Sequence, residues 1–212
     1  QMLASVVRYG FWTYYQHTGD QHTIAAIYPK ARRYVLDVWQ LGEDGLVVER
    51  QGGWTWGDWG ENKDMPLLYN GWYYLALDGL KKMAELVGST DDVAECDRRM
   101  ASLRKHFNAS FWQGSQYRSR DYKGKPDDRG HALAVVAGLA KQQQYRAIRE
   151  VFKRQRHASP YMEKYVLEAL YQMGYPDDAA RRMKERYRPM LESPLTTLWE
   201  GWGIGAEGFG GG

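Results

Sequence analysis

Apolar residues recur along most of the chain at the three- and four-residue spacing of an amphipathic α-helix. The spacing predicts eight helices, separated by Gly, Pro and cap-forming polar residues. They cover about residues 1–18, 23–41, 66–88, 90–108, 128–140, 142–156, 160–173 and 177–191, and Asp20 or Thr23 opens the second. The helices are expected to form four consecutive hairpins.

The two helices of a hairpin differ in polarity. Those that begin near residues 66, 128 and 160 are apolar on nearly all sides, whereas their partners carry a charged face. A helix that is hydrophobic all round is buried, and a helix with one polar face contacts water. The alternation predicts two concentric layers, as in an α/α toroid, although an open solenoid of helices would alternate in the same way.

Two stretches interrupt the helical pattern. Residues 42–63 are rich in Gly, and Val47 and Val48 within them predict a short strand. Residues 116–121 are strand-like as well, and residues 123–126 predict a turn. The expected fold is therefore all-helical with a small β-containing loop.

The long loops that contain Trp or acidic residues precede the buried helices. They are residues 54–64, 127–129, 157–161 and 198–202, whereas the turns at the opposite helix ends are tight. Loops that precede alternate helices of such a bundle meet at one end. We therefore expect one elaborated mouth that carries a binding pocket, and one plain end.

Composition narrows the functional classes. The formal net charge is +3 and the Lys and Arg residues are spread along helical faces, which argues against a nucleic-acid partner. No apolar run approaches the roughly 20 residues that span a bilayer. The lone Cys96 cannot form an internal disulfide. Neither metal-ligand spacing nor a phosphate-binding loop is present, so no metal or cofactor is predicted.

The aromatic content, with 9 Trp and 16 Tyr, is high for a helical core. Indole faces stack on pyranose rings and carboxylates bind hydroxyl groups, so Trp beside acidic residues in loops predicts a sugar site. Glu200 lies between Trp199 and Trp202, whose indoles would desolvate its carboxyl group and suit it to acid–base chemistry. A helix cap or a pair with Arg is the alternative role for Glu200.

Other polar residues in these loops have local explanations. Asp58 either contacts sugar or forms an Asx turn. The segment 127–129, Asp-Asp-Arg, fits a helix cap with a salt bridge, and His131 fits a buried core histidine. Glu163 and Lys164 lie one turn into a buried helix, where an ion pair is costly unless it lines a cavity, and this favours a functional role.

Several segments together resemble one known family. Residues 196–202, Thr-Thr-Leu-Trp-Glu-Gly-Trp, resemble the Thr-Thr-(Ile/Leu)-Trp-Glu-x-Trp segment of bacterial inverting α-L-rhamnosidases, whose catalytic domain has six helical hairpins. Residues 57–59, Gly-Asp-Trp, are similar to a loop of that family, and residues 28–34, 127–134 and 159–164 match it in order and spacing. The resemblance covers nearly the whole chain.

The resemblance implies an (α/α)6 toroid of the six-hairpin glycosidase type, here an incomplete ring of about four hairpins. Residues 1–212 would then be a piece of a single catalytic domain, toward its C-terminal end, with N- and C-terminal parts missing. The start at Gln1 inside a periodic segment and the end in three Gly residues suggest the same. The full-length protein is expected to be periplasmic or secreted, as such bacterial enzymes generally are.

The resemblance also implies inverting hydrolysis of terminal α-L-rhamnosyl residues, with Glu200 as general base and a rhamnose-containing glycan or glycoside as partner. An inverting enzyme needs a second carboxyl group about 6.5–9.5 Å away as general acid. The family takes that acid from a motif upstream of this chain, so the piece alone is expected to be inactive; Glu49 is a minor candidate. Substrate contacts are expected from Trp56, Asp58, Trp59, Glu61, Asp128, Arg129, Tyr161, Glu163, Trp199 and Trp202.

Three other functions remain open. One is another sugar enzyme on the same toroid, such as an unsaturated glucuronyl hydrolase or a polysaccharide lyase, although a lyase would favour a Tyr/His pair with Arg that we do not find. The second is a non-catalytic helical-repeat module that binds protein, against which the clustering of Trp at one end counts. The third is a toroid that binds glycan without cleaving it.

Overall fold

The computed structural model describes residues 6–50 and 56–203, and the chain forms two compact units. The first unit consists of Gln1–Gly57 and Met65–Trp112, and the second of Asp58–Asp64 and Gln113–Gly212. The described residues contain eight α-helices, as the apolar spacing predicts. Isolated β-bridges are the only strand-like pairing among them, so the all-helical fold class is confirmed.

The helices of the first unit are α1 (Thr13–Thr18), α2 (Gln21–Arg32), α3 (Met65–Val87) and α4 (Thr90–Phe111). The first two predicted helices are each divided, because Val6–Trp12 before α1 and Arg33–Val38 after α2 are π-helical. Asp20 rather than Thr23 caps α2, accepting a hydrogen bond from the Thr23 N–H at 3.0 Å. The chain enters this cap through Gly19, which has a φ of 68°.

The helices of the second unit are α5 (Asp128–Val136), α6 (Tyr145–Arg154), α7 (Pro160–Gln172) and α8 (Pro176–Leu191), with a 3-10 turn at Gln142–Gln144 before α6. Pro160 and Pro176 occupy first turns, where the missing N–H costs nothing. Helix α5 ends four residues earlier than about residue 140, which the apolar pattern predicts. The reason is Gly138, whose φ of 68° is not helical and closes the C-terminus.

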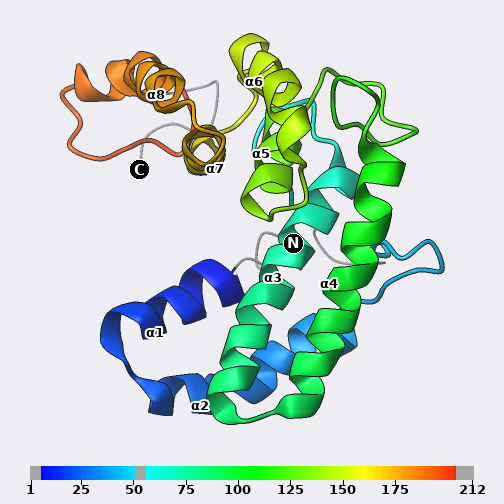
Figure 1. Cartoon of the computed structure of the whole chain (residues 1–212). Coiled ribbons are helices and arrows are strands. Elements are labelled where there is room, and N and C mark those ends of the chain that lie inside the picture. Colours follow the sequence, from blue (N-terminus) through cyan, green and yellow to red (C-terminus); the bar gives the residue numbers. More distant parts are fainter. Residues whose placement is uncertain (1–5, 51–55, 204–212) are drawn as a thin grey trace. The chain divides into compact units, whose positions relative to one another are not determined.

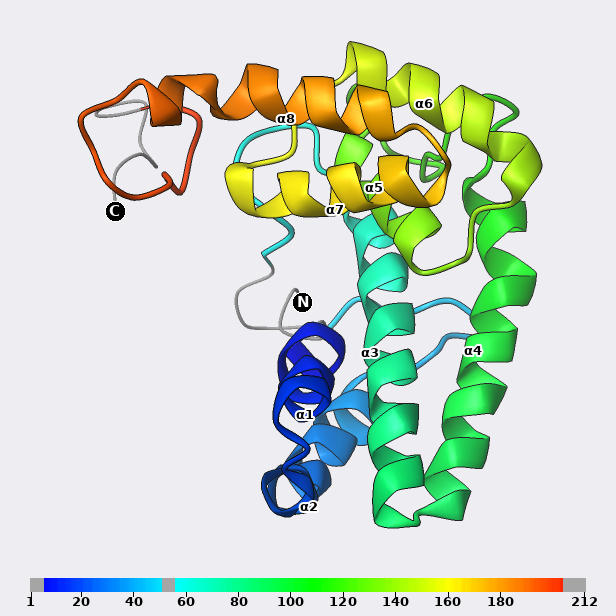
Figure 2. The same cartoon turned by 60° about the vertical axis from the view of Figure 1, so that its left-hand side comes forward.

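The predicted contrast between buried and striped helices is confirmed for α3 and α5, whereas α7 leaves Tyr161, Lys164 and Tyr171 exposed and is buried on one side only. In α5 all residues but Val136 are buried, and the buried residues of α3 run almost without a break from Leu67 to Leu80. Helices α4, α6 and α8 bury one face only. Helix α3 packs against α4 and α7 against α8, and both pairs lie side by side in the two views of Figures 1 and 2.

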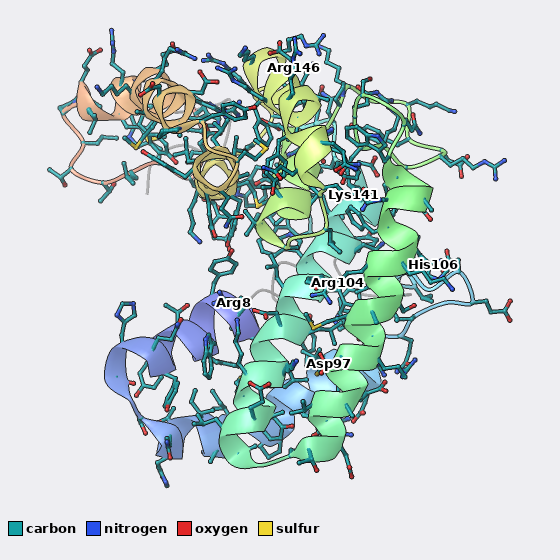
Figure 3. The ribbon with its side chains drawn as sticks, viewed as in Figure 1. Arg8, Asp97, Arg104, His106, Lys141 and Arg146 are labelled. Atoms are coloured by element: carbon teal, nitrogen blue, oxygen red, sulfur yellow. The ribbon has the colours of Figure 1, made fainter. Side chains whose placement is uncertain are left out.

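Buried polar groups hold the first unit together as well. Arg99 of α4 donates to the carbonyls of Leu36 and Trp39, at 2.9 and 2.8 Å, and to the hydroxyl of Tyr73 at 2.6 Å. It therefore satisfies carbonyl groups left free where the π-helical segment ends. Outside this core the charged face of α4 carries ion pairs near the surface, such as that of Asp97, labelled in Figure 3, with Lys81 of α3. Exposed pairs of this kind add little stability.

Both strand predictions are wrong in detail. Val47 forms only an isolated antiparallel bridge with Leu41. Residues 116–121 form no strand, and two of their N–H groups bond to side chains instead of to a neighbouring strand. The Tyr117 N–H donates to His131 at 2.8 Å and the Ser119 N–H donates to Asp64 at 2.7 Å. Tyr117 and Ser119 are buried, whereas the residues between and beside them are not.

Candidate active site

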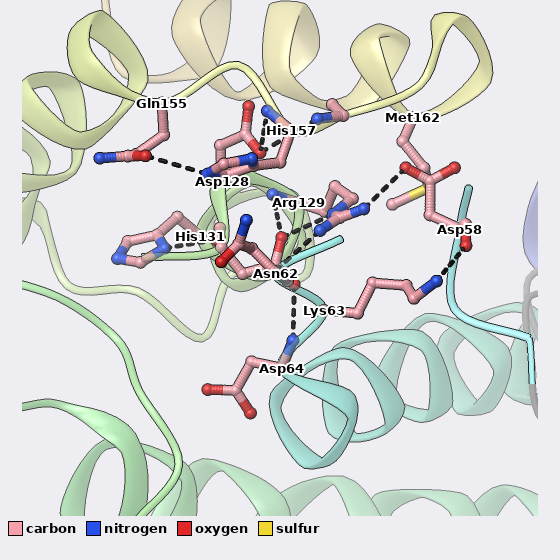
Figure 4. A network of polar contacts seen from close by, with 12 residues as sticks. Asp58, Asn62, Lys63, Asp64, Asp128, Arg129, His131, Gln155, His157 and Met162 are labelled. Carbon is pink, nitrogen blue, oxygen red and sulfur yellow. Dashed lines mark hydrogen bonds and ion pairs between the residues drawn. The ribbon is translucent and has the colours of Figure 1, made fainter. Parts of the chain in front are cut away.

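The Gly-Asp-Trp loop of the second unit, Asp58–Asp64, is organised around the side chain of Arg129 (Figure 4). The Arg129 side chain is completely buried, and all five of its N–H groups are used. Nε donates to Asp127 at 2.6 Å and Nη1 donates to Asp58 at 3.2 Å. The remaining three bonds reach the carbonyls of Trp59, Glu61 and Asn62. Arg129 therefore holds the loop in its conformation, and none of its N–H groups remains free to bind a substrate in this structure.

Asp58 is under conformational strain and is held by its side chain. Its φ is 151°, a conformation that L-residues adopt rarely and at a cost of roughly 1–3 kcal/mol. Its buried Oδ2 accepts hydrogen bonds from Arg129 and from the Ser159 N–H, the latter at 2.9 Å. Burial raises the pKa of the Asp58 carboxyl group, and Arg129 opposes the rise. Oδ1 is buried and has no partner among the described residues.

Two further aspartates fix the start of α5. Asp127 caps the helix, and its Oδ2 accepts the Asp64 N–H at 2.9 Å. Asp128 is buried, and its Oδ1 accepts the N–H groups of His157 and Ala158, both at 3.2 Å. The helix cap and salt bridge proposed for residues 127–129 on local grounds thus exist, and they also tie three loops together.

His131 is a buried histidine with both ring nitrogens bonded. Nε2 accepts the Tyr117 N–H at 2.8 Å, so Nδ1 carries the proton and donates to the Asp127 carbonyl at 2.7 Å. Burial lowers the pKa of His131 to about 4. The prediction of a satisfied core histidine is confirmed.

This environment predicts an acid sensitivity. The unfolded chain protonates His131 near pH 6.5, but the folded chain resists until about pH 4, so stability is lost as the pH falls through this window. We expect wild-type full-length protein to lose more in thermal midpoint between about pH 7.5 and about pH 5 than a His131→Gln variant does. The exposed His22→Gln variant is the matched control and should behave like wild type. An equal loss in wild type and His131→Gln would contradict the prediction.

Glu163 forms a buried ion cluster with two arginines of α8. Arg182 donates to both carboxylate oxygens of Glu163, at 2.6 and 3.0 Å, and Arg186 donates at 2.5 Å. Arg182 also donates to Asp128 at 2.8 Å, which connects α8 to the start of α5. Lys164, in contrast, is half exposed and pairs with Glu168. The predicted unusual burial of Glu163 is therefore explained by charge pairing within the protein.

The Trp-Glu segment of residues 199–202 follows α8. Trp199 is buried, and its Nε1 has no hydrogen-bond partner among the described residues. The Trp202 Nε1–H donates to the Ala158 carbonyl at 2.7 Å. Glu200 between them is exposed, so the expectation that the flanking indoles desolvate it is wrong for the described residues. The reason is that the Trp202 indole turns toward Arg186 and Tyr187.

The structure thus brings together the segments that were predicted to converge: residues 58–64, 127–129, 157–159 and 202. The hydrogen bonds that join them link residues far apart in the sequence. Trp59 and Glu61 take part through their carbonyl groups, and the Glu61 side chain is exposed. Tyr161 is 47% exposed, with its hydroxyl 3.3 Å from that of Tyr165. Trp56 and Glu49 belong to the other unit, and Trp54 lies outside the described residues.

Sequence reasoning missed the partners of the predicted carboxylates. Arg182 and Arg186 are spaced i, i+4 on the buried face of α8, opposite Glu163. That spacing is visible in the sequence, but charged residues on an outer helix usually contact water. Asp64 was missed too; its carboxylate accepts the N–H and the hydroxyl of Ser119.

A pocket of about 150 Å³ opens between α6, α7 and α8 and has a basic lining. Arg149 and Arg181 there pair with Asp178, and Arg156 pairs with Glu185. Because these three cations are paired with carboxylates of α8, we assign this pocket no ligand.

Within residues 6–50 and 56–203, no group of three or more His, Cys, Asp and Glu side chains is placed to hold a metal ion. None of the helices in this part of the chain is long and apolar enough to cross a membrane.

The chain belongs to the family described as the bacterial α-L-rhamnosidase six-hairpin glycosidase domain, which matches residues 4–207. This confirms the resemblance seen in the sequence. A comparison with curated proteins found no match.

Solved structures share the fold. A rhamnosidase from Klebsiella oxytoca with rhamnose bound has a TM-score of 0.77 at 22% identity, over 92% of this chain and 39% of that one. A GH78 rhamnosidase from a Bacillus species has a TM-score of 0.75 at 21% identity, over 90% of this chain and 22% of the other. The α-L-rhamnosidase of Streptomyces avermitilis, complexed with L-rhamnose, has a TM-score of 0.70 at 18% identity, over 95% and 20% of the two chains. The chain therefore spans well under half the length of these enzymes.

Proposed function

We propose that the protein carrying this chain is a glycoside hydrolase that removes terminal α-L-rhamnosyl residues with inversion, and that Glu200 is its general base. Family membership over residues 4–207 is the observation that carries the proposal. Two structural neighbours contain rhamnose, which supports this sugar as the substrate group.

The described geometry is compatible with the proposed role of Glu200. The carboxyl group is exposed, so water can reach it, and buried Trp199 and hydrogen-bonded Trp202 hold the main chain on either side of it. A general base must lie within hydrogen-bond reach of the attacking water, and a fixed main chain favours such placement. Asp58 is the second carboxyl group of interest, because its unpartnered Oδ1 is a free acceptor for a sugar hydroxyl if the loop opens.

The general acid is proposed to come from a part of the protein outside this chain. An inverting pair needs carboxyl groups about 6.5–9.5 Å apart. Glu49 accepts a hydrogen bond from the Tyr69 hydroxyl at 3.1 Å and remains the minor candidate within the chain. If the acid lies elsewhere, residues 1–212 alone release no product.

The test is hydrolysis of p-nitrophenyl α-L-rhamnoside by the full-length protein, followed by proton NMR in the first minutes. Rhamnosidase activity with inversion releases nitrophenol and β-L-rhamnose before mutarotation. Initial α-L-rhamnose would overturn inversion but keep the hydrolase. Absence of release from folded full-length protein would overturn the rhamnosidase proposal, and a parallel panel of p-nitrophenyl glycosides and an unsaturated uronide would show whether another sugar is cleaved.

A further inference from the structure

The indole of Trp202 is fixed from three directions, although it lies in a loop. The guanidinium carbon of Arg186 lies 4.0 Å from the centre of the ring, a cation–π contact. Tyr187 packs edge-on at 5.0 Å between ring centres, and the indole N–H donates to the Ala158 carbonyl.

Arg186 is itself fixed by a chain of buried charges. Its Nη1 donates to Glu163 at 2.5 Å, and Glu163 is clamped in turn by Arg182 through both carboxylate oxygens. The Arg186 side chain is only 6% exposed. A guanidinium group bonded in this way is held in place, with its central carbon over the indole ring.

Ala158 is the junction between this chain and the predicted sugar-binding loops. Its N–H donates to Asp128, and its carbonyl accepts from both Trp202 and Arg186, at 2.7 and 3.0 Å. The next N–H, that of Ser159, donates to Asp58. The main chain at residues 158–159 thus connects two carboxylates of the candidate site with the Trp-Glu segment.

Only Gly201 separates the fixed indole from Glu200, and Gly201 is buried. The conformational freedom of Gly201 would let Glu200 change its orientation, unless Trp202, the residue that follows Gly201, is held in place. We propose that Arg186 is a positioning residue: together with Glu163 and Ala158 it holds Trp202, and through Trp202 it sets the orientation of Glu200. This inference rests on the proposed function, since it assigns to Glu200 the role of base.

Arg186 acts through other residues and does not touch substrate. Its Nη2 donates to the carbonyls of Arg156 and Ala158, its Nη1 to Glu163, and its face is covered by Trp202. The effect of replacing it should therefore fall on turnover and not on substrate binding. A misplacement of about 1 Å at a reacting group can cost on the order of 100-fold in rate.

The test uses full-length protein and p-nitrophenyl α-L-rhamnoside, with Arg186→Gln and the milder Arg186→Lys. We expect Arg186→Gln to lower kcat by about 10- to 100-fold with KM changed far less, and Arg186→Lys to recover part of the loss. Arg188→Gln, an exposed residue on the same helix, is the control and should leave kcat unchanged. Thermal midpoints of all variants show whether each is folded.

Two readouts separate positioning from general stability. In a double-mutant cycle, Arg186→Gln should add no loss to a Glu200→Gln variant, because both act on the same base; independent, multiplying losses would overturn the proposal. With 5-fluorotryptophan, the Trp202 resonance should shift in Arg186→Gln and Arg186→Lys, and an unchanged resonance in a folded variant would overturn it as well. If Arg186→Gln does not fold, both the double-mutant cycle and the fluorotryptophan resonance are measured with Arg186→Lys. Full activity in Glu200→Gln would instead overturn the proposed function, while the resonance still tests the contact.

Discussion

Glu200→Gln is expected to lower kcat of the full-length protein on p-nitrophenyl α-L-rhamnoside by about 100- to 10,000-fold, the usual contribution of a general base. Gln has the size of Glu but cannot accept the proton of the attacking water. Because Glu200 is exposed and is followed by an anchored Trp202, the substitution should leave the fold and KM nearly unchanged. Nitrophenol release at saturating substrate measures the effect, and Glu192→Gln, an exposed residue at the C-terminus of α8, is the matched control.

Azide distinguishes a lost base from a damaged site. A smaller Glu200→Ala variant leaves room for an anion that needs no deprotonation before it attacks. Added azide should therefore restore nitrophenol release and yield β-L-rhamnosyl azide, the product of attack on the opposite face. Turnover that remains near wild type in Glu200→Gln would rule out Glu200 as the general base.

The sequence predicted which segments would meet but not how they are bonded. Apolar periodicity placed the helices, and the position of the loops before alternate helices predicted that Asp58, Arg129, Ser159 and Trp202 would come together. The spacing of residues in the sequence cannot show, however, where each side chain points. The Arg129 side chain bonds to five acceptors of its own protein and supports the loop, and its contact with sugar stays a prediction.

The same limit explains what was missed on α8. In the sequence, Arg182 and Arg186 look like residues on the solvent-exposed face of an amphipathic helix. Only the structure shows that their side chains are buried and paired with Glu163. Burial of a charge depends on a partner that can be far away in the sequence, here 19 and 23 residues. Buried ion clusters are for this reason among the features least accessible from periodicity, and they hold the loops of the candidate site in place.

Arg129→Met is expected to destabilise the protein by about 3–5 kcal/mol, because it leaves the buried carboxylates of Asp58 and Asp127 without their cation. Both carboxyl groups already have a raised pKa from burial, to about 6 for Asp127, with Arg129 opposing the rise. Without Arg129 the folded state would hold protons that the unfolded state has released. The deficit relative to wild type should therefore be larger at about pH 7.5 than at about pH 5.

Urea denaturation of the full-length protein at both pH values measures this deficit. Arg146→Met is the matched control, since Arg146 is an exposed arginine of α6, labelled in Figure 3, and should change stability little. A second variant isolates the cause: adding Asp58→Asn to Arg129→Met should recover part of the loss, because a buried amide costs less than an unpaired carboxylate. A deficit that does not depend on pH and is not reduced by Asp58→Asn would mean that Arg129 stabilises the loop by its carbonyl bonds and packing alone.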